Sequence, residues 1–422
     1  TTTRRRSTRR RSTRMEHKKE VASFFSVDDH ADALKEFNEN VMPNLEADFR
    51  TNYKGKAGKK IGVIGGDRKY AGAPYFAAMA ACKAGADIVH VFCHEEAAKA
   101  IKSYSPDLIV HACLKDSRDA PDPSDDDDDD DDVKQEGVRK FLEENWEMIA
   151  RMDAIVVGPG LGRDWYTWLL VCAAVNVASI RCVPMVFDAD ALYMIGTFFN
   201  GRDALRKETK DMRDMIDTWR NVGQMSFNWG PPRLSNVPAN GFIVFTPNVR
   251  EFTYGFNPEK PEVAKVTVDN FLGTNYELRV NYPSILAKGA DDIFVHLEGP
   301  EGPIKFENVP GSKKRCGGQG DILSGVLAVF LAWSRDKHVR DSSTSSNTQP
   351  GTRADRPKAE EDSSSSFRES SKLACFCASK LTREGARRAY EKHKRSVQSS
   401  DILVELPGAL EDLFPSSSSS SS

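Results

Sequence analysis

Short apolar runs separated by helical patterns constrain the fold of this chain more than any other feature. Such runs are typical of strands that a sheet buries on both faces, and a repeated order of strand, turn, helix and strand is typical of parallel sheets. The sequence therefore predicts an α/β fold with a mainly parallel sheet, whose ligands gather at the carboxyl ends of the strands. The predicted strands lie at residues 61–66, 87–93, 108–111, 154–157 and 185–188.

Size and charge narrow the class of protein. The chain has 422 residues, which exceeds one typical domain, but long stretches lack the apolar content of a core. Its net charge of −3 argues against nucleic-acid binding along the whole chain, because such domains usually carry a basic excess. No apolar stretch approaches the roughly 20 residues that cross a bilayer. We therefore expect no nucleic-acid partner and no membrane insertion.

Low-complexity segments flank and interrupt the predicted domain. Residues 1–14 contain only Thr, Arg and Ser, so we predict that residues 1–40 form a disordered extension with a lead-in helix. A single α/β domain is expected at 41–414, followed by a disordered Ser-rich tail at 415–422. Insertions into this domain are expected at about 115–132, 200–240 and 336–372.

Two of these insertions have compositions that predict disorder. Residues 125–132 are eight consecutive aspartates, which repel one another, although calcium binding stays open on charge grounds. Residues 336–372 are rich in Ser, Arg and Asp with few apolar side chains, and we expect a loop without regular structure. Order is expected to resume at Leu373, because residues 374–390 have a helical pattern.

The eight cysteines are scattered through apolar segments, and no C-x-x-C pair or matching histidine spacing predicts a zinc site. They are expected to be buried free thiols in a reducing compartment, which favours the cytoplasm. The Arg- and Ser-rich residues 1–14 leave the mitochondrion as the alternative, although they lack the apolar face of a transit peptide.

The stretch Arg315–Asp321 holds three glycines within four residues and runs directly into the apolar residues 322–333. Glycines allow backbone N–H groups to face an anion where a helix begins, so the stretch predicts a phosphate site. The alternative is an ordinary glycine turn before a core helix.

Three further stretches at strand ends each have two interpretations. Gly158–Gly162 permits the close approach of a ligand, or forms a tight turn. Asp188–Asp190 leads into a helix, so one carboxylate is expected to enter a site and the other to cap the following helix. Lys288–Asp292 offers a cation for phosphate, or forms a surface β-turn.

A fourth stretch, Thr246–Glu251, follows another strand. Asn248 can cap a helix, and Glu251 at the third following position completes a capping box. The functional alternative places Glu251 near a magnesium ion, through water, at a triphosphate.

Together these stretches resemble the ribokinase-like superfamily and, within it, the ATP-dependent NAD(P)H-hydrate dehydratases. The resemblance covers roughly residues 40–334 and 373–414 and implies a three-layer αβα sandwich with a mainly parallel central sheet. Two departures, Ala191 in place of the usual glycine and Ala71 in place of a common threonine, remove no group with known chemistry. The matching stretches, in family order, are Ile61–Gly66 with Tyr70–Pro74, Gly158–Gly162, Asp188–Asp190, Thr246–Glu251, Lys288–Asp292, and Gly311–Ser312 with Arg315–Gly325.

The family's reaction restores NADH or NADPH from the (6S)-hydrated form, uses ATP and Mg²⁺, and gives ADP and phosphate. The resemblance implies that Asp321 is the base that takes the hydroxyl proton of the hydrate, and that the helix start keeps this carboxylate ionised. It also implies that the N–H groups of Gly318 to Gly320 stabilise charge on the transferred γ-phosphoryl group.

Two sets of binding residues follow from the same resemblance. The hydrated nucleotide is expected to contact Gly160, Gly162, Asn248, Val249, Arg250, Glu251, Phe252, Thr253, Tyr254 and Asp321. ATP is expected to contact Lys288, Gly289, Ala290, Asp291, Asp292, Gly311, Ser312, Lys313, Lys314, Arg315, Cys316, Gly317, Gly318, Gln319 and Gly320. Family members commonly form homo-oligomers, and a separate NAD(P)H-hydrate epimerase is expected to interconvert the R and S hydrates.

Two other functions stay open at this point. A vitamin or sugar kinase would keep the fold and leave its product phosphorylated, although such enzymes rarely carry the stretch Arg315–Gln319. A nucleotide-binding regulator without catalysis is the class expected if Asp321 were missing, and Asp321 is present.

Overall fold

The computed structural model describes residues 23–25, 27–43, 59–119, 130–199, 243–251, 284–296, 303–345 and 356–415. Several expectations lie outside these residues: the extension at 1–14, aspartates 125–129, the insertion at 200–240, the serines from residue 416 onward, and the predicted substrate contacts Phe252, Thr253 and Tyr254.

A sheet of ten strands runs through the described part of the chain, in the order β1-β10-β9-β8-β7-β6-β5-β2-β3-β4. Neighbouring strands are parallel except at the β8–β9 and β9–β10 pairs, which confirms the mainly parallel sheet. The strands are β1 Ser23–Phe25, β2 Lys60–Ile64, β3 Ile88–His94, β4 Leu108–Leu114, β5 Ala154–Val157, β6 Met185–Phe187, β7 Ile243–Phe245, β8 Ser284–Ala287, β9 Asp292–His296 and β10 Ile304–Phe306.

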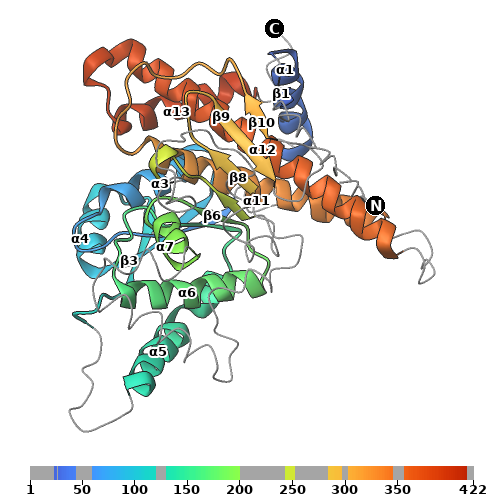
Figure 1. Cartoon of the computed structure of the whole chain (residues 1–422). Helices are drawn as coiled ribbons and strands as arrows, with labels where there is room; N and C mark the ends of the chain where they lie inside the picture. Colours follow the sequence, from blue (N-terminus) through green and yellow to red (C-terminus); the bar gives the residue numbers. More distant parts are fainter. Residues whose placement is uncertain are drawn as a thin grey trace, which may run out of the picture.

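Helices cover both faces of this sheet and complete three layers (Figure 1). Side chains alternate across each strand, so on β2 Ile61 and Val63 join one buried cluster while Ile64 joins the other. The first cluster includes α3 Gly72–Lys83, α4 Glu95–Tyr104, α11 Gln319–Ser345, α12 Arg356–His393 and α13 Ser399–Leu413. The second includes α5 Asp130–Ala150, α6 Trp165–Ile180 and α7 Asp190–Phe199. This arrangement confirms the predicted αβα sandwich.

The helices differ in how fully they are buried. From Ile322 to Trp333, α11 is buried on all sides, because it lies between α3, α12 and the sheet. That location explains why this stretch lacks the polar stripe of a surface helix. Among the helices that the structure describes, none is long and apolar enough to cross a bilayer.

The N-terminal segment belongs to the packed fold, although the domain was expected to begin at residue 41. The chain there forms β1, which pairs with β10, then α1 Val27–Glu36 and the π-helical turn η1 Phe37–Val41. Phe37 is fully buried, with ring centroids 4.7 Å from Phe330 and 5.7 Å from Phe414. Apolar periodicity can show which face of a short helix is buried, but not what packs against it. The sequence therefore could not indicate a contact with a helix nearly 300 residues away.

The expected loop at 336–372 also needs correction. α11 continues through Ser345, and α12 begins at Arg356, so both ends of this stretch are helical. Helix propagation from a packed segment adds one hydrogen bond per residue without a new nucleus, so polar residues can extend a helix that the core has already formed.

Phe37→Ala tests whether the N-terminal segment stabilises the domain. We expect the free energy of unfolding to fall by about 3–5 kcal/mol, because a buried aromatic side chain is removed from between two others. Denaturant unfolding measures the change, with exposed Glu39→Ala in the same turn as the control. Equal stabilities of the two variants would show that the segment is dispensable.

Candidate active site

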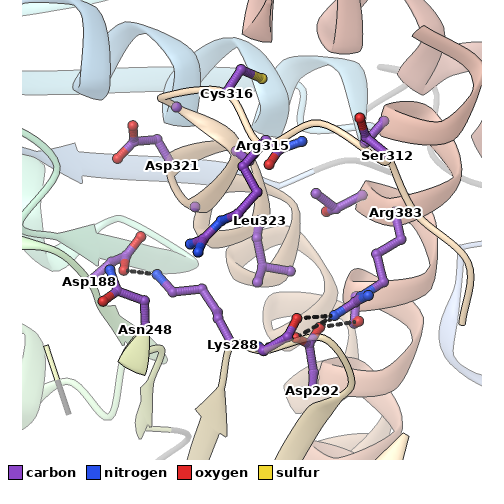
Figure 2. Close-up of a pocket in the computed structure, with 18 of the residues that line it drawn as sticks. Asp188, Asn248, Lys288, Asp292, Ser312, Arg315, Cys316, Asp321, Leu323 and Arg383 are labelled. Atoms are coloured by element: carbon purple, nitrogen blue, oxygen red, sulfur yellow. Dashed lines mark hydrogen bonds and ion pairs between the residues drawn. The ribbon is translucent and has the colours of Figure 1, made fainter. Parts of the chain in front are cut away.

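A cavity of about 950 Å³ opens at the carboxyl ends of the central parallel strands (Figure 2). The residues that follow β5, β6, β7 and β8 supply one side of it: Gly160, Asp188, Asn248 and Lys288. Backbone pairing continues past the strand ends, since Asp188 N donates to the carbonyl of Val157 at 3.0 Å and Lys288 N donates to that of Pro247 at 2.8 Å. These bonds hold the strand ends side by side.

The centre of this side is an ion pair between Lys288 and Asp188. The Lys288 Nζ lies 2.5 Å from Asp188 Oδ1 and 3.8 Å from Glu251 Oε2, and the Asp188 side chain is only 1% exposed. Burial lowers the pKa of Lys288, but the charges of Asp188 and Glu251 outweigh it, so the pKa is raised and the ammonium stays charged. The lysine thus neutralises carboxylates that the fold brings together.

Asn248 and Glu251 form the predicted capping box. Asn248 Oδ1 accepts from the N–H groups of Arg250 at 2.9 Å and Glu251 at 3.1 Å, while Glu251 Oε2 accepts from Asn248 N at 2.9 Å. Glu251 also lines the cavity beside Lys288. The capping and functional interpretations are therefore compatible, because one carboxylate serves the helix start and faces the cavity.

Asp321, the third residue of α11, also lines the cavity. Burial raises its pKa to about 7, and the negative charges of Asp188 and Glu251 act in the same direction, while Lys288 opposes them. Burial therefore opposes the helix start, which was expected to keep this carboxylate ionised. One lysine does not compensate for several carboxylates held in a desolvated site.

As predicted, one of the two aspartates after β6 enters the cavity, but the other does not cap a helix. Asp188 enters the cavity, whereas Asp190 accepts from Gly162 N at 3.1 Å and from Arg163 Nε at 3.5 Å. Asp190 is the first residue of α7, and instead of capping that helix it holds the turn after β5. Within that turn Gly158 has φ +119°, and a Cβ there would lie 1.9 Å from the Asp188 carbonyl, so only glycine fits.

The opposite wall includes one face of α12, which the sequence did not identify as part of a site. Its residues 379, 382, 383 and 386 recur at helical spacing and line the cavity. Arg383 binds both carboxylate oxygens of Asp292 and donates to the carbonyls of Gly289 and Ala290, each at 2.9 Å. The side chain therefore anchors the turn between β8 and β9. Two signals were available: the helical spacing of small and cationic residues, and the resemblance, which already covered residues 373–414.

The cavity collects most, but not all, of the residues expected to bind ATP. Asp291, Lys313, Lys314 and Gly317 do not line it, and Asp291 instead pairs with Lys305 at 2.9 Å. The residues that do line it are Lys288, Gly289, Ala290, Asp292, Gly311, Ser312, Arg315, Cys316, Gly318, Gln319 and Gly320. Figure 2 shows the side chain of Arg315 reaching from the glycine-rich loop into the cavity. A guanidinium there suits a phosphate group.

Some of the residues expected to bind the hydrated nucleotide line the cavity, and others do not. Gly160, Asn248, Val249 and Glu251 line the cavity, as does Asp321. Gly162 and Arg250 do not line it, although Arg250 lies between the lining residues Val249 and Glu251.

The donor set of this cavity fits a magnesium ion. Carboxylates of Asp188, Glu251 and Asp321 outnumber the ammonium of Lys288, and hard oxygen ligands are those that Mg²⁺ prefers. An added cation would also relieve the repulsion that raises the pKa of Asp321.

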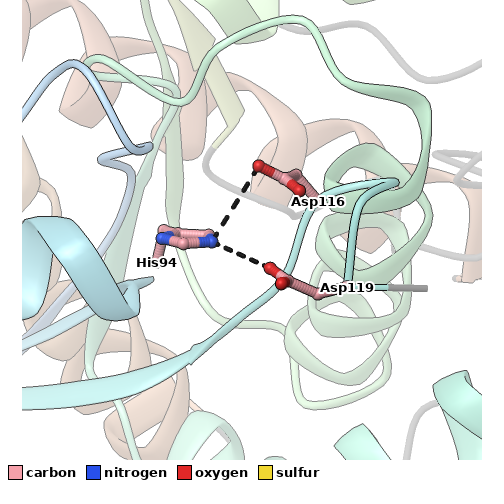
Figure 3. A group of neighbouring side chains, drawn as sticks. All are labelled: His94, Asp116 and Asp119. Atoms are coloured by element: carbon pink, nitrogen blue, oxygen red, sulfur yellow. Dashed lines mark hydrogen bonds and ion pairs between the residues drawn. The ribbon is translucent and has the colours of Figure 1, made fainter. Parts of the chain in front are cut away.

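A second group of titratable side chains lies at the carboxyl ends of β3 and β4 (Figure 3). His94 Nε2 lies 3.1 Å from Asp119 and 4.0 Å from Asp116. Arg68 and Arg118 bond to Asp116 at 2.6 Å each. Burial raises the pKa of Asp116, but these hydrogen bonds outweigh it and hold the pKa well below its usual range. The carboxylates are thus neutralised by arginines, and the group serves to fix two loops.

Comparisons with known proteins show which enzymes the chain is similar to. A family model described as NAD(P)H-hydrate dehydratase matches residues 61–207 and 236–407. The ATP-dependent (S)-NAD(P)H-hydrate dehydratase of Arabidopsis thaliana is 35% identical over 89% of this chain and 84% of its own length. The enzyme of the same name from Schizosaccharomyces pombe is 32% identical over 87% of this chain and 90% of its own.

Solved structures share the fold at low sequence identity. A ribokinase-like superfamily protein from Enterococcus faecalis has a TM-score of 0.54 at 16% identity, covering 93% of this chain and 97% of its own. An ADP/ATP-dependent NAD(P)H-hydrate dehydratase from Bacillus subtilis, co-crystallised with ATP and Mg²⁺, has a TM-score of 0.51 at 14% identity, covering 93% and 99%. These likenesses support the ribokinase-like fold.

Lys288→Met tests the central ion pair. We expect the free energy of unfolding to fall by about 3 kcal/mol, because buried carboxylates lose their cation. Lys99→Met is the matched control, since the Lys99 pairs with Glu95 and Glu96 are exposed, and it should leave stability unchanged. Chemical denaturation compares the variants, and an equal effect of both would contradict a central role for Lys288.

Proposed function

The chain belongs to the NAD(P)H-hydrate dehydratase family, and we propose that this cavity carries out the ATP-dependent dehydration of (6S)-hydrated NADH and NADPH. The products are NADH or NADPH, ADP and phosphate, so the enzyme is a carbon–oxygen lyase that repairs nicotinamide nucleotides. One observation supports the proposal most strongly. Asp321 lies at the glycine-rich start of α11, in the same cavity as the Lys288–Asp188 pair and the Arg315 side chain.

We assign Asp321 as the base that takes the proton from the hydrate hydroxyl. The hydroxyl oxygen then attacks the γ-phosphorus of ATP, and ADP leaves. A pKa near 7 is close to the operating pH, which suits a group that must be ionised and still be a competent base. The backbone N–H groups of Gly318 and Gly320 would stabilise the charge that develops on the transferred phosphoryl group.

The second half of the reaction removes phosphate. The carbon–oxygen bond breaks as the lone pair of the ring nitrogen moves toward the carbon, and a proton then leaves the neighbouring carbon. These steps regenerate the dihydronicotinamide ring. The protein's part is to hold the ring and exclude water, which we assign to the side of the cavity formed by Gly160, Asn248, Val249 and Glu251.

ATP binding is assigned to the stretches Lys288–Asp292 and Gly311–Gly320. Most of their residues line the cavity, and Arg383 supports the first of these stretches. We propose that Mg²⁺ is held through water by Glu251. Bound there, the ion would neutralise charge on the triphosphate. Phe252, Thr253 and Tyr254 remain predicted contacts of the hydrated nucleotide.

Partners and compartment follow from the same proposal. We propose that a separate epimerase converts the R hydrate to the S hydrate, and that the protein acts in the cytoplasm, with the mitochondrion as the alternative. A homo-oligomer is expected, as is common in the family.

The central test is recovery of NADH from chemically prepared hydrate. Protein, ATP and magnesium should restore the near-ultraviolet absorbance of the dihydronicotinamide, with equal amounts of ADP and phosphate released. Asp321→Asn should lower kcat by between about 100-fold and 10,000-fold, since the base is removed while the shape is kept. Asp336→Asn, on the same helix but outside the cavity, is the control. A stable phosphorylated product would instead indicate a kinase.

The pH dependence gives an independent check on Asp321. A base acts in its deprotonated form, and the raised pKa means that this form predominates only above about pH 7 in the free enzyme. We therefore expect kcat/KM to rise tenfold per pH unit on the acid side and to level off above the pKa. Initial rates across neutral pH measure this profile. A profile that is flat or falls with rising pH would assign the proton transfer to another group.

A further inference from the structure

The segment between α12 and α13 contacts the glycine-rich loop at two points. Lys314 Nζ donates to the carbonyls of Arg395 at 2.5 Å and Val397 at 3.2 Å. Ser399 Oγ, at the start of α13, donates to the carbonyl of Gly317 at 2.6 Å. Lys314, expected to bind ATP, therefore directs its ammonium to the C-terminal segment.

Ser399 is placed directly against the turn of this loop. The residue is 2% exposed, and its Oγ lies 3.6 Å from Cys316 Sγ. Gly318 has φ +97°, and a Cβ at that position would lie 2.7 Å from Ser399 Oγ. The serine hydroxyl thus occupies space that a side chain at residue 318 would need.

The bond to Gly317 sets the direction of a neighbouring N–H group. The carbonyl of Gly317 and the N–H of Gly318 belong to one planar trans peptide unit, so they point in opposite directions. Because Ser399 binds the carbonyl, the N–H must face the other way. The next peptide is fixed separately, since the carbonyl of Gly318 accepts from Ile322 N at 3.0 Å within the first turn of α11.

A peptide between two glycines is easily reoriented when nothing binds it, because neither residue has a Cβ that restricts φ and ψ. The loop residues on either side are held by other bonds, including those between Ser312 and Lys314. The hydroxyl of Ser399 is the contact on the described residues that selects one orientation of the Gly317–Gly318 peptide.

We propose that Ser399 is a positioning residue for the transfer of the phosphoryl group. It acts through the Gly317 carbonyl and keeps the N–H of Gly318 directed at the charge that develops in the transition state. This inference rests on the proposed function, in which Gly318 belongs to the anion-binding backbone. Through this contact α13 would contribute to catalysis, although it supplies no lining residue of the cavity.

The start of α13 allows a clean test. Asp401 Oδ2 accepts from Gln398 N at 2.8 Å, so the helix keeps this cap when the hydroxyl of Ser399 is removed. Ser399→Ala should fold with an unchanged melting temperature. The matched control is Ser396→Ala, three residues away, whose exposed hydroxyl donates to the carbonyl of His393 at 2.8 Å.

We expect Ser399→Ala to lower kcat about tenfold, which is about 1.4 kcal/mol, and to leave KM for the hydrated nucleotide unchanged. Ser399→Cys, whose thiol is a weaker donor, should give a smaller fall when it is assayed with a reductant that prevents a disulfide with Cys316. Ser396→Ala should match the wild type. A kcat of Ser399→Ala equal to that of the control would overturn the proposal, as would a loss that only reflects a lower folded fraction.

Hydrogen–deuterium exchange provides a readout that does not depend on activity. The amides of residues 317–320 should exchange faster in Ser399→Ala than in Ser396→Ala, with the rest of α11 unchanged. Equal exchange would overturn the proposal. A wild-type protein without dehydratase activity would contradict the proposed function alone, because the exchange measurement would still report whether Ser399 orders the loop.

Discussion

The ion pair between Lys288 and Asp188 is the interaction on which the site depends. It joins the ends of two strands that are neighbours of β7, at a place where the fold also directs Glu251 and Asp321 inward. Without a cation, these carboxylates could not be desolvated together at acceptable cost. Even with Lys288 present, burial and the remaining negative charge raise the pKa of Asp321 to about 7. The excess of negative charge costs folding stability. It also helps to raise the pKa of Asp321 toward neutrality and favours the binding of a cation.

The parallel sheet makes this concentration of charge possible. Parallel strands present their carboxyl ends at one edge, so residues separated by 100 positions in sequence, Asp188 and Lys288, come within 2.5 Å. Helices then close the site from the other side. Arg383 on α12 holds the turn after β8, and Ser399 on α13 holds the glycine loop before α11. The nucleotide-binding stretches are thus positioned by the C-terminal helices as well as by the strands they follow.

Local sequence patterns predicted those parts of the fold that short-range forces decide. The strand at 154–157 has the predicted bounds because its four residues are all buried and apolar. The capping box of Asn248 and Glu251 was predicted because its bonds span three residues. The strands β9 and β10 were missed, since β9 has only three consecutive apolar residues between Asp292 and His296, and a lysine interrupts β10. Phe37 was placed outside the domain for a related reason, because its partners Phe330 and Phe414 are distant in sequence.

The sequence by itself determined the fold class, the order of the strand-end motifs and the residue types that surround the cavity. These follow from periodicity and from resemblance, and neither requires a distance between remote residues. Only the tertiary structure decided which side chains face the cavity and in what charge state. Lys314 turns away from it, Asp190 binds Gly162, and burial raises the pKa of Asp321 to about 7. Burial and Coulomb energies depend on three-dimensional neighbours, so the charge of a carboxylate cannot be inferred from its position at the start of a helix.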